Sequence, residues 1–123
     1  MKKLGLILAA GLLTFAVSAQ ADEAEFGGQV KKIGAYEGEL VVKGSDVHLY
    51  VIKDHKPMNP TASMSANVRL FVNNAESTVE LKPEGNKLVG KAASPATGNV
   101  RAMTTLADGG KEVGKAQYNL NVK

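Results

Sequence analysis

The sequence of this 123-residue chain predicts an all-β protein, a small antiparallel β-sandwich preceded by an export signal. Three observations lead to this prediction. Apolar and polar residues alternate with period two in several short runs, turn-forming residues separate these runs at intervals of about 8–12 residues, and helical periodicity is absent from the runs after the signal.

The first 21 residues have the pattern of a cleavable signal peptide. Two lysines follow Met1, an apolar stretch of about 14 residues comes next, and the small residues Ala19 and Ala21 precede the acidic Asp22. This stretch is shorter than the roughly 20 residues that a membrane-spanning helix needs. We therefore expect cleavage after Ala21, a periplasmic protein, and no membrane span after cleavage. Secretion beyond the outer membrane is the alternative.

Removal of the signal leaves about 100 residues, enough for one domain with a modest aliphatic core. The formal net charge of +3 falls to +1, because Lys2 and Lys3 leave and 13 basic residues then face 12 acidic ones. No basic stripe with interleaved aromatic residues occurs, so no nucleic-acid partner is expected. Cysteine is absent, so neither a disulfide nor a lipid anchor on cysteine is expected.

The alternation also predicts which side of each strand is buried. Val47, Leu49 and Val51 are expected to face the core, and the residues between them to face outward. The same pattern recurs in residues 66–72, 77–82, 100–106 and 116–122.

Turn residues lie between these runs. Lys43-Gly44-Ser45-Asp46 is expected to join a strand over 36–42 to the next over 47–52, and Asn73-Asn74 to join another pair, because Asn tolerates positive φ. Further turns are expected at 83–86 and 107–110, and a longer loop with two prolines at 54–60 that crosses between sheets.

Seven or eight short strands in one domain predict a sandwich of about seven strands with immunoglobulin-like or related Greek-key topology. The cysteines and tryptophan of true immunoglobulin domains are missing, so only the architecture is predicted. We expect residues 22–28 to form a flexible leader and residues 29–123 to form the sandwich.

Catalytic motifs are absent from the sequence. There is no Gly-x-Ser-x-Gly elbow, phosphate-binding glycine loop, zinc-binding His-Glu-x-x-His or calcium loop. Glu37 and Glu39 are spaced as neighbours on one face of a strand and would matter for catalysis only beside further carboxylates. A non-catalytic protein is therefore expected, and a hydrolase ranks last among the alternatives.

Four residues are candidates for a metal site. Imidazole and thioether groups are the ligands that copper(I) favours, and silver(I) follows by the same softness. The candidates are His48, His55, Met58 and Met64. Against this hypothesis, methionine more often fills gaps in a core, and an outward histidine on a strand is more often solvated.

A second candidate is an apolar partner surface. Tyr50, Ile52 and Phe71 are expected on the outward faces of neighbouring strands, where a contiguous patch would bind a periplasmic protein. The alternative is that loops or the leader cover these side chains.

Several short sequence motifs resemble those of a known group of proteins. They are Phe26-Gly27-Gly28-Gln29-Val30, Tyr36-x-Gly38-Glu39-Leu40-Val41-Val42, Leu49-Tyr50-Val51, Leu81-Lys82-Pro83 and Asn86-Lys87-Leu88-x-Gly90. In this order they resemble small periplasmic β-sandwich modules found alone or at the N-termini of heavy-metal efflux adaptor proteins. The resemblance implies a β-sandwich fold and a periplasmic location. That group often opens His-Gly-Gly, with the histidine suspected of metal contact, whereas Phe26 stands there in this chain.

Two functions follow as hypotheses. The first is a periplasmic, non-catalytic binding or accessory module involved in copper or silver handling or efflux. The second is a periplasmic protein–protein interaction domain without a metal role, in which a partner lies against an edge strand or the Tyr50 and Phe71 face.

Overall fold

The computed structural model describes residues 24–123, and the predicted signal peptide lies outside them. The chain forms the strands β1 (Gln29–Ile33), β2 (Tyr36–Lys53), β3 (Lys56–Pro57), β4 (Met64–Val72), β5 (Ala75–Glu84), β6 (Lys87–Ala96), β7 (Gly98–Asp108) and β8 (Lys111–Val122). A helix able to cross a membrane is not found within residues 24–123. The predicted all-β class is confirmed.

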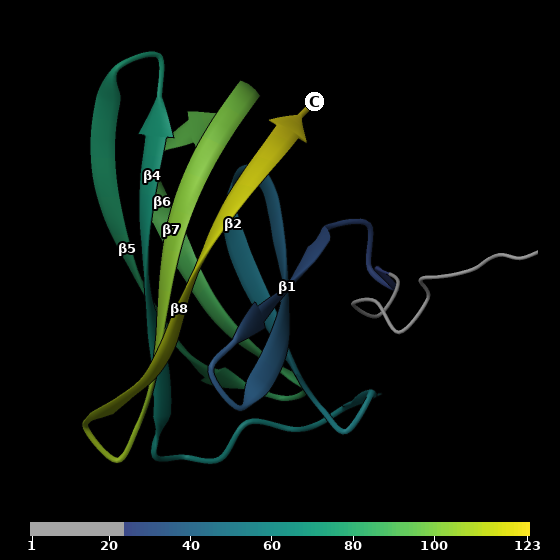
Figure 1. Cartoon of the computed structure of the whole chain (residues 1–123). Helices are drawn as coiled ribbons and strands as arrows, with labels where there is room; N and C mark the ends of the chain where they lie inside the picture. The colour runs from purple at the N-terminus through teal and green to yellow at the C-terminus, as the bar shows by residue number, and fades with distance from the viewer. Residues whose placement is uncertain (1–23) are drawn as a thin grey trace, which may run out of the picture.

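All strand pairs are antiparallel, and they form one continuous sheet in the order β1-β2-β6-β5-β4-β7-β8, with β3 paired to β2. Figure 1 shows this sheet curling until β8 lies beside β1, which gives a nearly closed, barrel-like shape. The strand β5 connects the two halves of the sheet. It pairs first with β4 and then, over its last three residues, with β6. Two separate layers of an immunoglobulin-like sandwich are therefore not confirmed.

The predicted turn at residues 43–46 is wrong. These residues lie inside the 18-residue strand β2, where Gly44 has a positive φ of 59° and the register shifts between Gly44 and Asp46. The strand pairs with β1 before this bulge and with β6 after it. A bulge bends a strand and increases its twist, so β2 turns a corner of the barrel without ending.

The predicted turn at Asn73-Asn74 is confirmed as a two-residue hairpin loop, with φ values of 51° and 69°. Residues 107–110 also contain a turn, at Gly109-Gly110. Both central residues of such a tight hairpin turn need positive φ, which Asn and Gly tolerate. The predicted loop at 54–60 differs in part, because Asp54-His55 forms another tight turn that leads into β3.

The inward side chains of the strands form one core. Val47, Leu49 and Val51 are at most 1% exposed, which confirms the predicted face of that run. The alternating residues of β4 and β5 are likewise buried, and Tyr118 of β8 lies fully buried among them. The residues between these buried positions point outward, so the outer faces of β4, β7 and β8 carry mostly polar side chains.

Candidate functional site: an arginine and asparagine groove

The structure does not bring the four predicted metal ligands together. Met64 is 2% exposed and belongs to the core, whereas His48 points outward from β2, since its neighbours Val47 and Leu49 point inward. His48 and Met64 therefore lie on opposite sides of the sheet. The His48 ring makes an edge contact with Tyr50, with the ring centroids 6.4 Å apart.

The other two predicted ligands lie at the end of the β2–β3 hairpin. His55 is exposed in the tight turn, and Met58 is half-buried against the core, with its backbone N–H donating to the Val51 carbonyl at 2.9 Å. Within residues 24–123, no three His, Cys, Asp or Glu side chains are grouped closely enough to hold a metal ion. A copper(I) or silver(I) role stays a prediction from the sequence.

The three residues of the predicted apolar patch do not share one surface. Tyr50 and Ile52 belong to β2 and Phe71 belongs to β4, and the strands β6 and β5 lie between these two. Ile52 is only 6% exposed. The Tyr50 ring is stacked under Phe26, with the centroids 3.8 Å apart, so the segment before β1 covers it, as the alternative had it.

Residues 25–28, expected as part of a flexible leader, are held against β2 by a buried carboxylate. The Glu39 side chain is 1% exposed and accepts backbone N–H groups from Glu25, Phe26 and Gly28, each at 2.8 Å. Three donors satisfy a carboxylate that would otherwise be buried at a large free-energy cost. This anchor explains Glu39 structurally and gives it no catalytic partner.

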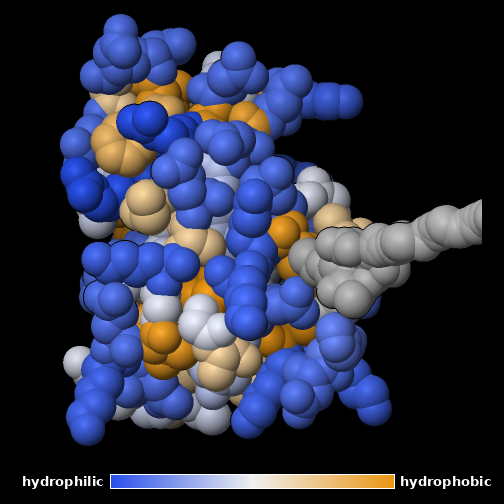
Figure 2. Space-filling view, in the orientation of Figure 1, coloured by the Kyte–Doolittle hydropathy of each residue, from blue (hydrophilic) through white to orange (hydrophobic). Residues whose placement is uncertain are grey.

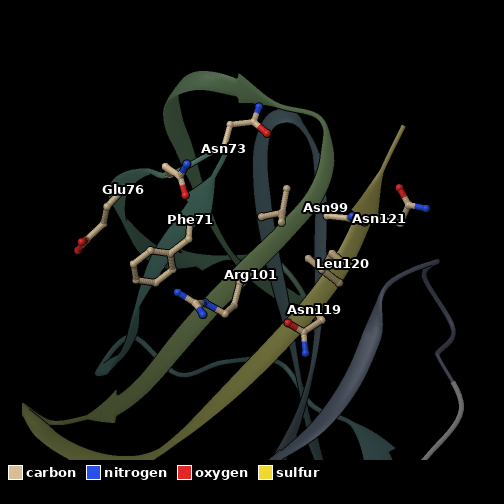
Figure 3. Close-up of a pocket in the computed structure, with 10 residues that line it drawn as sticks. Phe71, Asn73, Glu76, Asn99, Arg101, Asn119, Leu120 and Asn121 are labelled. Atoms are coloured by element: carbon tan, nitrogen blue, oxygen red, sulfur yellow. The ribbon is translucent and has the colours of Figure 1, made fainter.

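A groove of about 800 Å³ lies elsewhere, on the outward face of β4, β7 and β8. Phe71 and Arg101 are direct cross-strand partners there, and the Arg101 guanidinium carbon lies 4.6 Å from the centroid of the Phe71 ring. Figure 3 shows the two side chains next to each other on this face. The contact orients a long, flexible side chain, because a guanidinium group packs flat on an aromatic ring.

Ion pairing distinguishes the two arginines beside Phe71. Arg69 donates from Nε and Nη2 to Glu76 Oε2, at 2.9 and 2.6 Å, and both side chains remain about half exposed. Arg101 has no carboxylate within ion-pair distance among residues 24–123 and is exposed. The groove therefore contains one oriented and unpaired cation.

Asparagine side chains line the rest of the groove. They belong to Asn73, Asn74, Asn99, Asn119 and Asn121. Asn119 is the direct cross-strand partner of Arg101, and Asn121 that of Asn99, so the amides extend in register from β7 to β8. Figure 3 shows Asn73, Asn99, Asn119 and Asn121 spread along this face, with Asn119 next to Arg101 and Asn121 furthest from it. Figure 2 shows polar side chains over most of this side of the molecule, with apolar ones between them.

Arg101 and the asparagines were not predicted from the sequence to form a site. Their outward direction follows from the alternation, which places them opposite the buried Val100, Ala102 and Tyr118. The register of β4, β7 and β8 places Phe71, Arg101 and Asn119 side by side. This register could not be predicted from the sequence.

Comparison of the chain with protein families, with curated proteins and with solved structures gives no significant match.

Proposed function

We propose that this chain is an exported, non-catalytic binding module that binds an acidic oligosaccharide in the groove of β4, β7 and β8. The single observation that carries the proposal is the Arg101 guanidinium group, which is oriented by Phe71 and has no carboxylate partner among the described residues. Export rests on the signal-peptide pattern of the sequence.

Arg101 supports an anionic ligand. A guanidinium group presents several N–H donors in a planar fork that matches a carboxylate, and such charge-assisted pairs are stronger than neutral hydrogen bonds. The face of the Arg101 group toward Phe71 is occupied, but N–H donors lie in the plane of the group and remain able to bind. A uronic-acid carboxylate fits this donor set.

The asparagines support a ligand with many hydroxyl groups. Each side-chain amide offers both donors and an acceptor, so it can bind a sugar hydroxyl in either direction. Five such side chains line the groove that contains the one unpaired cation. A shallow groove across three strands also suits an extended chain better than a compact small molecule, which is usually enclosed.

The same groove favours binding over hydrolysis. Glycoside hydrolases ordinarily use two carboxyl groups that flank the bond to be cleaved. Glu76 is the single carboxylate among the residues that line the groove, and it is paired with Arg69. Retention of an acidic sugar chain is therefore the function for which this surface is best equipped.

Calorimetry with trigalacturonate, and with neutral maltotriose as the comparison, tests the proposal. We expect the protein to bind the acidic trisaccharide and not the neutral one. Arg101→Ala is expected to weaken binding about tenfold or more, because the charge-assisted pair contributes about 1.5–3 kcal/mol. Arg101→Lys should restore only part of the affinity, since lysine keeps the charge and loses the fork.

Lys91→Gln is the matched control, because Lys91 is an exposed cation of β6 outside the groove. This variant should bind as the wild type does. Equal affinity of Arg101→Ala and wild type for trigalacturonate would refute the proposal, as would the absence of binding by the wild type at millimolar concentration.

A further inference from the structure

We propose that the seam between β2 and the C-terminal end of β8 accepts an extended segment of a partner protein as an added β-strand. The proposal does not depend on Arg101, because it rests on the backbone edges of two strands, although Asn119, Leu120 and Asn121 line both the groove and the seam. The partner segment alternates apolar and acidic side chains.

The seam exists because β1 is much shorter than the strands on either side of it. The last pair between β1 and β2 is Gln29 with Leu40, whereas β2 continues to Lys53. Before Gln29 the chain no longer pairs with β2 as a strand: Gly27 has a positive φ of 87°, and the Gly28 N–H donates to Glu39 on the outward face. Gly28 packs against the Leu40 carbonyl, and Gly27 and Gly28 border the seam. Within the described residues, no strand follows β1 along residues 41–43 of β2.

The edge of β8 also faces the seam. The backbone N–H of Asn119 donates to the side-chain oxygen of Gln29 at 3.0 Å, so this N–H points away from β7. Backbone groups in an antiparallel strand alternate between its two sides, which directs the N–H and C=O of Asn121 to the seam as well. The Gln29 amide oxygen thus stands where the carbonyl of a neighbouring strand would bind.

Two hollows of about 220 and 370 Å³ lie in the seam between the two edges. Leu40, Val42, Leu120 and Val122 of the two edges contribute to their lining. The larger hollow, which Val41 also lines, exposes mainly apolar atoms, and the smaller one mainly polar atoms. An added strand would direct every second side chain toward these residues, and these side chains must therefore be apolar.

The other side chains of the added strand face the outside of the seam. Lys43 and Lys123 border the second hollow, and neither is in an ion pair with another residue of the described chain. Acidic side chains complement these two lysines. Unpaired backbone groups, a mainly apolar lining of the larger hollow and a cationic rim beside it together define a strand-addition site.

NMR titration with an acetylated six-residue peptide that alternates valine and glutamate tests this site. We expect saturable shifts at residues 41–43 and 119–122, and slower hydrogen exchange of the Asn121 amide. A peptide that alternates valine and lysine should bind at least several-fold more weakly. The valine–glutamate peptide with N-methylated backbone amides should not bind, because it cannot donate to the edges.

Asn121→Pro provides the matched variant on the protein. It removes an N–H that makes no bond to β7, and proline is tolerated on an edge strand. We expect about fivefold to tenfold weaker peptide binding, whereas Asn121→Ala, which keeps the N–H, should bind as the wild type does. Arg101→Ala should leave peptide binding unchanged, so failure of the groove proposal and failure of this one are distinguishable.

Three outcomes would overturn the proposal. Equal binding of the methylated peptide would show that the edges are not used. An Asn121 amide already protected in the free monomer would show that the chain itself fills the seam. Concentration-dependent dimerisation that protects the same amide would assign the seam to a second copy.

Discussion

The hydroxyl of Tyr118 donates a hydrogen bond to the backbone carbonyl of Gly38 at 2.7 Å, across 80 residues of sequence. Tyr118 belongs to β8 and Gly38 to β2, which are not neighbours in the sheet because β1 lies between them. Tyr118 is fully buried, so this bond joins the two sides of the seam from inside the core.

Tyr118→Phe should lower the free energy of unfolding by about 1–3 kcal/mol, because the change leaves the buried Gly38 carbonyl without its donor. Urea unfolding followed by circular dichroism measures this loss. Tyr50→Phe is the control, since the Tyr50 hydroxyl makes no hydrogen bond within residues 24–123. Equal stability of the two variants would contradict the structural role of the Tyr118 hydroxyl.

Burial raises the pKa of the Tyr118 hydroxyl well above its usual value. Below about pH 10 the phenol is protonated in both the folded and the unfolded chain, and its contribution to stability is complete. Above that pH only the unfolded chain loses this proton, so the free energy of unfolding should fall as pH rises. Urea midpoints between pH 8 and 11.5 should fall more steeply for the wild type than for Tyr118→Phe.

Absorbance at 295 nm provides a second measurement of the same prediction. In the folded state, wild type and Tyr118→Phe should give the same rise in tyrosinate absorbance with pH. The wild type should show its additional rise only as it unfolds. A larger rise for the folded wild type would show that Tyr118 ionises in place.

Glu39→Gln should release residues 25–28 from β2. A glutamine has one acceptor oxygen for the three N–H groups that Glu39 now satisfies, and its amide group repels the others. We expect faster hydrogen exchange at Phe26 and Gly28 and a loss of about 2–4 kcal/mol in stability. Glu80→Gln, at an exposed position of β5, should change neither quantity.

Met64 should behave as a core residue and not as a metal ligand. Met64→Ala is expected to cost about 2–5 kcal/mol of stability, and Met64→Leu less than about 1.5 kcal/mol, because leucine keeps the volume. Copper(I) titration of wild type and Met64→Leu under reducing conditions should give identical curves. Weaker copper(I) binding by a stably folded Met64→Leu would contradict this assignment.

Several elements of the fold were predictable from local chemistry. The alternation in 47–52 and 66–72 identified the buried faces, and Asn73-Asn74 identified a turn, because these features depend on neighbouring residues only. The turn predicted at Gly44 was wrong. A glycine among polar residues is typical of a turn, but here pairing with β1 and then β6 keeps β2 extended through a bulge.

The candidate surfaces were less predictable than the strands. Tyr50 and Phe71 are both outward residues, as expected, but placing them on neighbouring strands was wrong because the strand order puts β6 and β5 between them. Similarly, His48 and Met64 are close in sequence and lie on opposite sides of the sheet. Proximity in sequence says little about proximity in a sheet whose strand order is not sequential.

The sequence by itself determined the all-β class, the inward faces of the strands and the turns at Asn73-Asn74 and Gly109-Gly110, since each follows from side-chain alternation or from backbone freedom at a few adjacent residues. Only the tertiary structure decided that the strands form one nearly closed sheet, that the Arg101 guanidinium lies over the Phe71 ring beside Asn119, and that the Tyr118 hydroxyl bonds to the Gly38 carbonyl. These relationships depend on strand order and register, which arise from the packing of the whole core and from no single segment.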